Sequence, residues 1–398
     1  MDFIKNFASQ STFESLESHP LFASAYQLAA IKRLERCATD DALRGLIANV
    51  LKPALLKAPV SSNCWQPELG AAMMAMQSGC YQKAAVYSLL ALQALRVPSR
   101  WEIDIIDPMR VSIGGHLFDI SGNTVIESDN SWLSVWSHAP ASRLELHWVD
   151  GRWERAQAGS LPDVWRYAAP IFAVGGGVSD IYIQAWEEPN DGRQDIVAEW
   201  PLPYRADKDL ERVTGAAAAI GGALDVLQYC GPHYIPWIRQ LFRGVASTPL
   251  GYDDMRQSGS YLAHAGVFNC GFPGAPPSLA EVIVHEVSHQ NFLLLNSLYQ
   301  LCDDSVDGLL YSSLKRKQRP LSRVLFAYHA AANMAIFWSD LSKKRRLDDY
   351  YLREQQEMND HAVDLYRTVK SAKGLTQHGA LFFNALAQTM QEKGILAA

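Results

Sequence analysis

The spacing of apolar residues divides the chain into three stretches. Between about residues 12 and 97, apolar positions recur every three or four residues, as at Leu21, Ala25 and Leu28. This spacing predicts amphipathic helices, which Pro98 ends. From about residue 100 to 205 apolar and polar residues alternate, as in Trp101–Ile105, which predicts antiparallel strands separated by glycine- and asparagine-rich turns. Helical spacing returns after about residue 207, over Leu210–Cys230, Ala280–Leu301, Leu321–Leu341 and His378–Gln391.

These patterns together predict an α+β protein with three regions. Residues 1–99 form an N-terminal helical region, residues 100–206 an antiparallel β region, and residues 207–398 a C-terminal helical region. Within the last region, Ser258–Phe272 is too rich in glycine and aromatic residues for a helix and predicts a strand or hairpin. The glycine run Gly175–Gly177 lacks the Lys-Ser/Thr of a phosphate-binding loop and indicates a turn of the β region.

Composition narrows the class of protein. A net charge of −6 without a long basic stripe is unsuited to nucleic acid. No apolar run reaches the eighteen or so residues that span a bilayer, and the N-terminus lacks a secretory signal. The six cysteines are scattered without a CxxC pair, which argues against a disulfide framework and fits a reducing cytosol. We therefore expect a cytoplasmic protein with no membrane or nucleic-acid partner.

One motif in the sequence indicates a metal-binding site. His285, Glu286 and His289 form H-E-x-x-H within an apolar segment that follows Pro276–Ser278. We expect Ser278 to be the N-cap of this helix. Two histidines four residues apart lie on one helical face, so both imidazoles can bind one metal ion. Glu286 would lie beside the metal, as a base acting on bound water or as a group that orients a ligand.

A metal needs at least a third ligand. The metzincin continuation fails, because Leu295 stands where the third histidine would be. A gluzincin glutamate is also missing at the expected distance, since the next glutamate is Glu354. His329, in the middle of an apolar helix, is the leading third ligand, with Asp340 and Asp304 as the alternatives.

The stretch from Ser258 to Trp338 resembles a known family. Ser258–Ser260 leads through a proline-rich turn into Leu279–Glu281, the second motif histidine is followed by a polar pair and leucine, and Tyr311-Ser312 is followed by Arg319-Pro320-Leu321. In these features the chain resembles the HExxH-motif peptide-modification proteins encoded beside ribosomally made natural-product peptides. These are described as iron- and 2-oxoglutarate-dependent peptide β-hydroxylases. Lys315 stands where that family has arginine.

The resemblance implies a ligand set and a co-substrate site. Fe(II) would be held by His285, His289 and His329 in a zincin-like helical domain, and 2-oxoglutarate and dioxygen would take the open positions. Arginine suits the distal carboxylate of 2-oxoglutarate because its fork bonds bidentately, so Arg319 is the first candidate. The remaining candidates for contacts with the co-substrate are Arg323, Lys315, Tyr311 and Asn333.

Two other functions stay open at this level. In a zinc metallopeptidase, the same histidines would bind zinc and Glu286 would activate water. A non-enzymatic peptide-binding protein would use the metal structurally, with closed coordination. Imidazole binds zinc and iron alike, so the residues alone do not separate these readings. The resemblance favours the hydroxylase, with a precursor peptide as substrate; Ser258–Phe272 would hold a peptide under either enzymatic reading.

Overall fold

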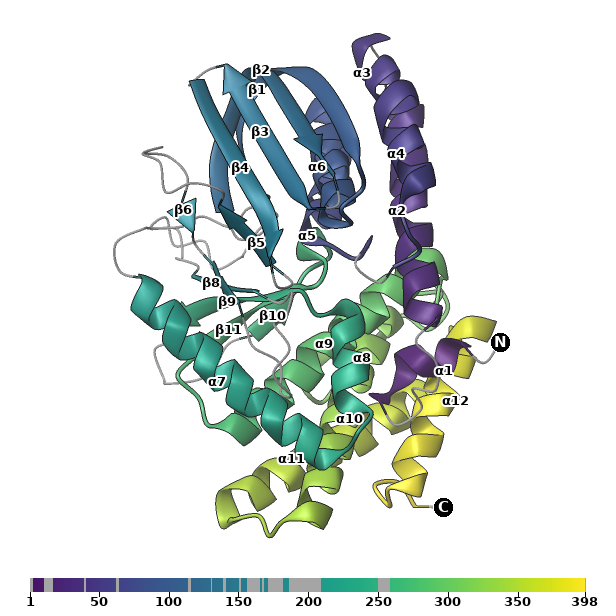
Figure 1. Cartoon of the computed structure of the whole chain (residues 1–398). Coiled ribbons are helices and arrows are strands. Elements are labelled where there is room, and N and C mark those ends of the chain that lie inside the picture. The colour runs from purple at the N-terminus through teal and green to yellow at the C-terminus, as the bar shows by residue number, and fades with distance from the viewer. Residues whose placement is uncertain are drawn as a thin grey trace. The chain divides into compact units, whose positions relative to one another are not determined.

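The computed structural model (Figure 1) shows an α+β protein, as the patterns predict. It has helices at the N-terminus, an antiparallel sheet in the centre and helices at the C-terminus. The structure describes residues 3–10, 17–38, 41–61, 64–113, 116–129, 131–138, 141–149, 152–155, 165–166, 168–170, 182–185, 209–249 and 258–397. The predicted turn at Gly175–Gly177 lies outside these residues.

The N-terminal region is helical up to residue 94. A run of π-helix, η2, joins two short helices of this region. The elements are α1 (Phe3–Ala8), α2 (Ser18–Cys37), α3 (Asp41–Leu46), η2 (Ile47–Leu51), α4 (Lys52–Lys57), α5 (Pro67–Gln77) and α6 (Tyr81–Ala94). Arg96, with a φ of 56°, lies in the turn that follows α6, and Pro98 then precedes the first strand.

The central sheet is an antiparallel meander in the order β1-β2-β3-β4-β5, with β6 paired to β2. Its strands are β1 (Ser99–Ile113), β2 (His116–Ser128), β3 (Trp132–His138), β4 (Ala141–Val149), β5 (Arg152–Arg155) and β6 (Trp165–Arg166). The register of β1 against β2 shifts between Ile105 and Met109. Pro108 lies within this irregularity, where its missing N–H costs no ladder bond. Trp101 is buried, as expected of a core residue.

A second, mixed sheet has the order β10-β11-β9-β8-β7. Its strands are β7 (Ala168–Pro170), β8 (Tyr182–Ala185), β9 (Gly244–Pro249), β10 (Ser258–Ser260) and β11 (Val267–Phe272). The strand or hairpin expected at Ser258–Phe272 is confirmed as the antiparallel pair β10–β11. His264 lies between these strands in the single turn η4 (Leu262–His264) and is buried.

The C-terminal region contains the predicted helices and others that the apolar pattern did not indicate. The helices are α7 (Asp209–Cys230), α8 (Tyr234–Leu241), α9 (Pro276–Leu298), α10 (Leu321–Lys344), α11 (Asp349–Ser371) and α12 (Gln377–Glu392). A two-stranded hairpin, β12 (Leu309–Ser312) and β13 (Lys317–Pro320), connects α9 to α10. None of the helices in the described part of the chain is long and apolar enough to cross a membrane.

The chain forms two compact units that cut across the three composition regions. We call Met1–Phe22, Gly222–Leu241 and Gly274–Ala398 the helical unit, and Ala23–Gly221 with Phe242–Pro273 the sheet unit. In the sheet unit, α6 packs on β1. The helical unit contains α1, α9 and α10, so it brings together segments more than three hundred residues apart.

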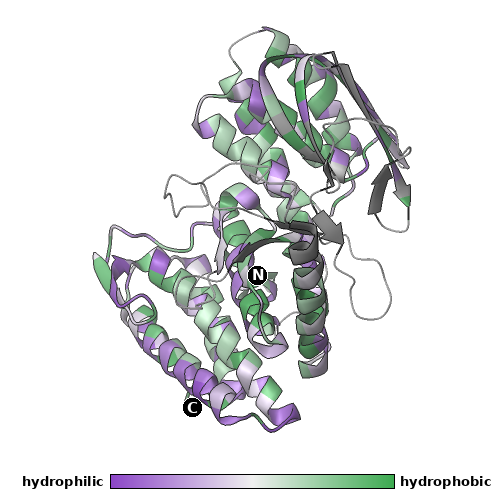
Figure 2. Cartoon of the chain, turned by 90° about the vertical axis from the view of Figure 1, so that its left-hand side faces the viewer, coloured by the Kyte–Doolittle hydropathy of each residue, from purple (hydrophilic) through white to green (hydrophobic). Residues whose placement is uncertain are grey.

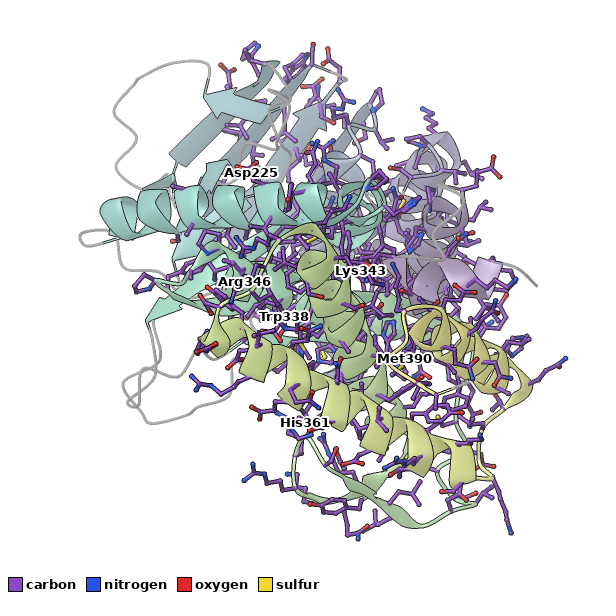
Figure 3. The ribbon with its side chains drawn as sticks, turned by 90° about the horizontal axis from the view of Figure 1, so that it is seen from below. Asp225, Trp338, Lys343, Arg346, His361 and Met390 are labelled. Carbon is purple, nitrogen blue, oxygen red and sulfur yellow. The ribbon has the colours of Figure 1, made fainter. Side chains whose placement is uncertain are left out.

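The core of the helical unit is built around α10. This helix contacts α9, α11 and α12, and α1 packs against α9 and α12. Figure 2 shows apolar residues concentrated on inner helices and polar residues on the outer ones. Trp338 of α10, labelled in Figure 3, is fully buried and donates its indole N–H to Glu281 Oε1 of α9 at 2.9 Å. A buried indole N–H usually has a hydrogen-bond partner. Here that partner is on α9, so the bond fixes α10 against α9.

Candidate metal centre

The H-E-x-x-H motif lies in the middle of α9, on a buried helix. Pro276 opens the helix, where its fixed φ and missing N–H suit the first turn. The N-cap is Ala275, without a side-chain hydrogen bond, so the prediction of Ser278 as the N-cap is wrong. Two prolines in the first turn remove donors that a cap would otherwise satisfy, and this is why no capping side chain is needed.

The structure brings His285, Glu286 and His289 together as a possible metal site. One ligand atom from each residue lies within 4.8 Å of the others. His285 Nε2 is 3.6 Å from Glu286 Oε1, and the two imidazole centroids are 4.4 Å apart with their planes at 80°. Ligands of a first-row metal, each bound at about 2.0–2.2 Å, are separated by distances of this size. The motif therefore supplies two nitrogen donors and one carboxylate.

Burial sets the protonation of both histidines. The pKa of His285 is lowered by desolvation, opposed by the Glu286 carboxylate and assisted by the Lys315 ammonium. The pKa of His289 is held well below its usual value, first by desolvation and then by His285, His329, Lys315 and Arg323. Both imidazoles are accordingly neutral at pH 7, which is the form that binds metal. The side chain of His285 is 22% exposed, whereas that of Glu286 is fully buried. His285 therefore lies on the more exposed side of the cluster.

The ring of His289 is held by stacking. Phe326 of α10 lies parallel to it, with centroids 3.8 Å apart and planes at 6°. His289 Nδ1 is buried and has no hydrogen-bond partner among the described residues. Metal-binding histidines usually donate their second ring nitrogen to a carbonyl or carboxylate, which fixes the ring. Here the phenyl ring of Phe326 fixes the plane of the imidazole.

His329, the predicted third ligand, lies outside the cluster. Its Nε2 is 2.9 Å from the carbonyl oxygen of Ala8, and Phe382 packs on its ring at 4.7 Å. Desolvation lowers the pKa of His329 to about 4, opposed by the Ala8 hydrogen bond. Asn333 donates to the same Ala8 oxygen at 2.9 Å and to the His329 carbonyl at 3.0 Å. These two residues therefore hold the end of α1 against α10.

The alternative carboxylate ligands are also engaged elsewhere. Asp340 accepts hydrogen bonds from Lys393 Nζ at 2.6 Å and Tyr234 Oη at 3.1 Å. Asp304 accepts from the backbone N–H and the hydroxyl of Ser322, at 2.7 and 2.6 Å. Neither belongs to the His285 cluster of the described residues.

The predicted co-substrate cations divide into two groups. Lys315 lies in the turn between β12 and β13, and Arg323 in the first turn of α10; both lower the pKa of His289. Arg319 is half-buried on β13, opposite Leu310. It is not among the groups that shift the pKa of His285 or His289. Lys315 and Arg323 are therefore the predicted cations that act electrostatically on the cluster. Tyr311 is 51% exposed on β12.

Sequence reasoning missed two contributors to the site. In the sequence, Phe326 is an ordinary apolar residue of a predicted helix. The structure stacks its ring on His289, where it orients the imidazole. The N-terminal segment also supports α9, since His19 Nε2 lies 2.7 Å from Asn291 Oδ1 and Phe7 packs on His19 with centroids 4.2 Å apart. No local signal in residues 1–22 marks this contact.

The donor set fits a divalent transition metal. Two neutral imidazoles and a carboxylate with open positions are the donors typical of non-haem Fe(II) oxygenases, and they also suit zinc. No protein-family model matches this chain, and no curated protein is similar to it in sequence.

Proposed function

We propose that the protein is an Fe(II)- and 2-oxoglutarate-dependent hydroxylase acting on a ribosomally made precursor peptide. The observation that carries this proposal is the cluster of two imidazoles and one carboxylate on α9. In this proposal His285, His289 and Glu286 hold the metal, so Glu286 is a ligand instead of the base considered from the sequence. The peptide substrate is taken from the resemblance of Ser258–Trp338 to peptide β-hydroxylases.

The iron would supply oxidation chemistry, with 2-oxoglutarate as the co-reductant. In the overall reaction, 2-oxoglutarate, dioxygen and a peptide C–H bond become succinate, carbon dioxide and a C–OH group, one oxygen atom entering each of succinate and the product. The role of the chain is to bind, orient and exclude water. Glu286 is fully buried, and Phe326 and Phe292 form an apolar wall on the α10 side of His289.

The cations near the cluster support a dicarboxylate co-substrate. Neither Lys315 nor Arg323 forms an ion pair within the described residues, and both act electrostatically on His289. A 2-oxo acid that binds at the metal through its keto-acid end needs a cation for its distal carboxylate. Peptide-bond hydrolysis by a zinc site has no such requirement, which is why we prefer the hydroxylase to the metallopeptidase.

The test is the affinity for 2-oxoglutarate, measured by calorimetry on the Co(II)-loaded protein, which does not turn over. Lys315→Ala and Arg323→Ala should each weaken binding about tenfold or more, because each removes a charge-assisted hydrogen bond. Arg319→Ala, the matched control on the neighbouring strand, should change it less than twofold. Equal affinities in all four proteins would remove the co-substrate assignment, and cleavage of a fluorogenic peptide by the zinc-loaded protein would favour the peptidase.

A further inference from the structure

The hairpin β12–β13 presents an apolar surface to solvent. Leu309 and Tyr311 alternate along β12 and are 63% and 51% exposed, whereas Ser312 is buried. Val306, just before the strand, is 52% exposed. Large apolar side chains gathered in this way on one short element are typical of a contact surface.

Basic side chains lie in the hairpin turn, on β13 and at the start of α10. Lys317 and Arg319 pair with Ser312 and Leu310, so they lie on the opposite face of the hairpin from Leu309 and Tyr311. Lys315, Lys317, Arg319 and Arg323 occur within nine residues, and none forms an ion pair within the described part of the chain. Arg316 differs, because it lines a cavity of about 430 Å³ with Glu357, Asp360 and His361 of α11; His361 is labelled in Figure 3. In a chain of net charge −6, this local excess of unpaired cations attracts an anionic partner.

The hairpin also has free edges. Among the described residues β12 and β13 pair only with each other, so each has one edge with no strand beside it; β12 also contacts α11, whereas the outer edge of β13 pairs with no described strand. Such an edge offers backbone N–H and C=O groups to an extended chain, and the alternating side chains beside it select the sequence.

The hairpin lies next to the metal cluster. β13 ends at Pro320 and leads directly into α10, which carries Phe326 against His289. Both strands contact α10. A chain bound along the hairpin would therefore be delivered to the metal.

We propose that the β12–β13 hairpin is the docking element for an extended, acidic segment of the peptide substrate. The unpaired edge requires an extended chain. Lys317 and Arg319 on one face of the hairpin select acidic residues, and Leu309 with Tyr311 on the other face accept apolar residues at the alternate positions. This inference rests on the proposed function for the identity of the substrate, but the docking surface itself is defined by the hairpin.

The test uses a fluorescein-labelled dodecapeptide of alternating Glu and Val, with alternating Lys and Val as its counterpart, and measures fluorescence anisotropy with the full chain. We expect the acidic peptide to bind at least tenfold more tightly than the basic one. Lys317→Glu and Leu309→Ser should each weaken it at least threefold. Lys343→Glu makes the same charge change on an exposed lysine at the end of α10, labelled in Figure 3, and should leave binding within twofold.

Equal binding of the two peptides, or equal weakening by Lys317→Glu and Lys343→Glu, would overturn the proposal. A concentration-dependent dimer that Leu309→Ser dissociates would also overturn it, because the hairpin would then be a contact between two copies of this chain. The two proposals fail separately. Anisotropy needs no metal, whereas the 2-oxoglutarate affinity of Lys317→Glu reports on the metal site alone and should equal that of the unchanged protein.

Discussion

Replacing Phe326 tests whether a stacked ring prepares His289 for metal. The phenyl and imidazole rings lie 3.8 Å apart and are parallel within 6°, and His289 Nδ1 has no hydrogen-bond partner among the described residues. Aromatic pairs contribute about 0.5–1.5 kcal/mol beyond the area that they bury. If this free energy holds the ring in its metal-binding orientation, Phe326→Leu should raise the dissociation constant for metal by about two- to tenfold.

The assay is competition for Co(II) with a chromophoric chelator, together with the visible spectrum of the bound Co(II). Leucine keeps most of the apolar volume, so the melting temperature should change little. Phe326→Tyr keeps the stack and should restore both affinity and spectrum. Phe382→Leu is the control, because it removes an aromatic ring that packs on His329 instead of His289, with centroids 4.7 Å apart; Phe382 is fully buried, whereas Phe326 is half-buried. An unchanged affinity and spectrum in Phe326→Leu would refute the stacking argument.

Two further predictions concern stability. Desolvation lowers the pKa of buried His19 from 6.5 to about 4, opposed by its Asn291 hydrogen bond. The unfolded chain therefore binds this proton more readily than the folded protein does. Lowering the pH from 7 to 5 should reduce the free energy of unfolding by about 2 kcal/mol through His19. Urea denaturation at the two pH values should show this reduction in the unchanged protein and not in His19→Gln. A pH dependence identical in both proteins would contradict this. A Cβ on Gly379 would lie 1.9 Å from the Leu301 carbonyl oxygen, so Gly379→Ala should destabilise by about 1–3 kcal/mol. Gly215→Ala, at a position in α7 with open space around it, should instead stabilise the protein by up to about 1 kcal/mol. Equal melting temperatures of Gly379→Ala and Gly215→Ala would contradict the clash at Gly379.

Much of the fold could be predicted because local periodicity decides it. The alternation at Trp101–Ile105 belongs to β1, and the helical spacing at Leu321–Leu341 belongs to α10. The helix α11 was missed because only Ala362, Leu365 and Val369 of its residues are buried, so its apolar stripe is narrow and a polar surface dominates the sequence.

The candidate site was predictable only where its residues are close in sequence. His285, Glu286 and His289 share one helix, and a fixed rise and turn brings them together. The position of His329 depends on which segment lies against α10, and that segment is α1, more than three hundred residues away. A long-range contact of this kind leaves no periodic signal. For the same reason the sequence did not indicate Phe326, which stacks on His289 only because α10 packs on α9.

The central claim, that α9 holds iron through His285, Glu286 and His289, is tested most directly by adding Fe(II) and then 2-oxoglutarate without oxygen and recording the visible spectrum. We expect a weak metal-to-ligand charge-transfer band that is lost in His289→Ala and in Glu286→Ala. His329→Gln, which can still donate to the Ala8 carbonyl, should keep the band. No band in the unchanged protein, or a band that survives Glu286→Ala and disappears in a folded His329→Gln, would contradict this ligand set.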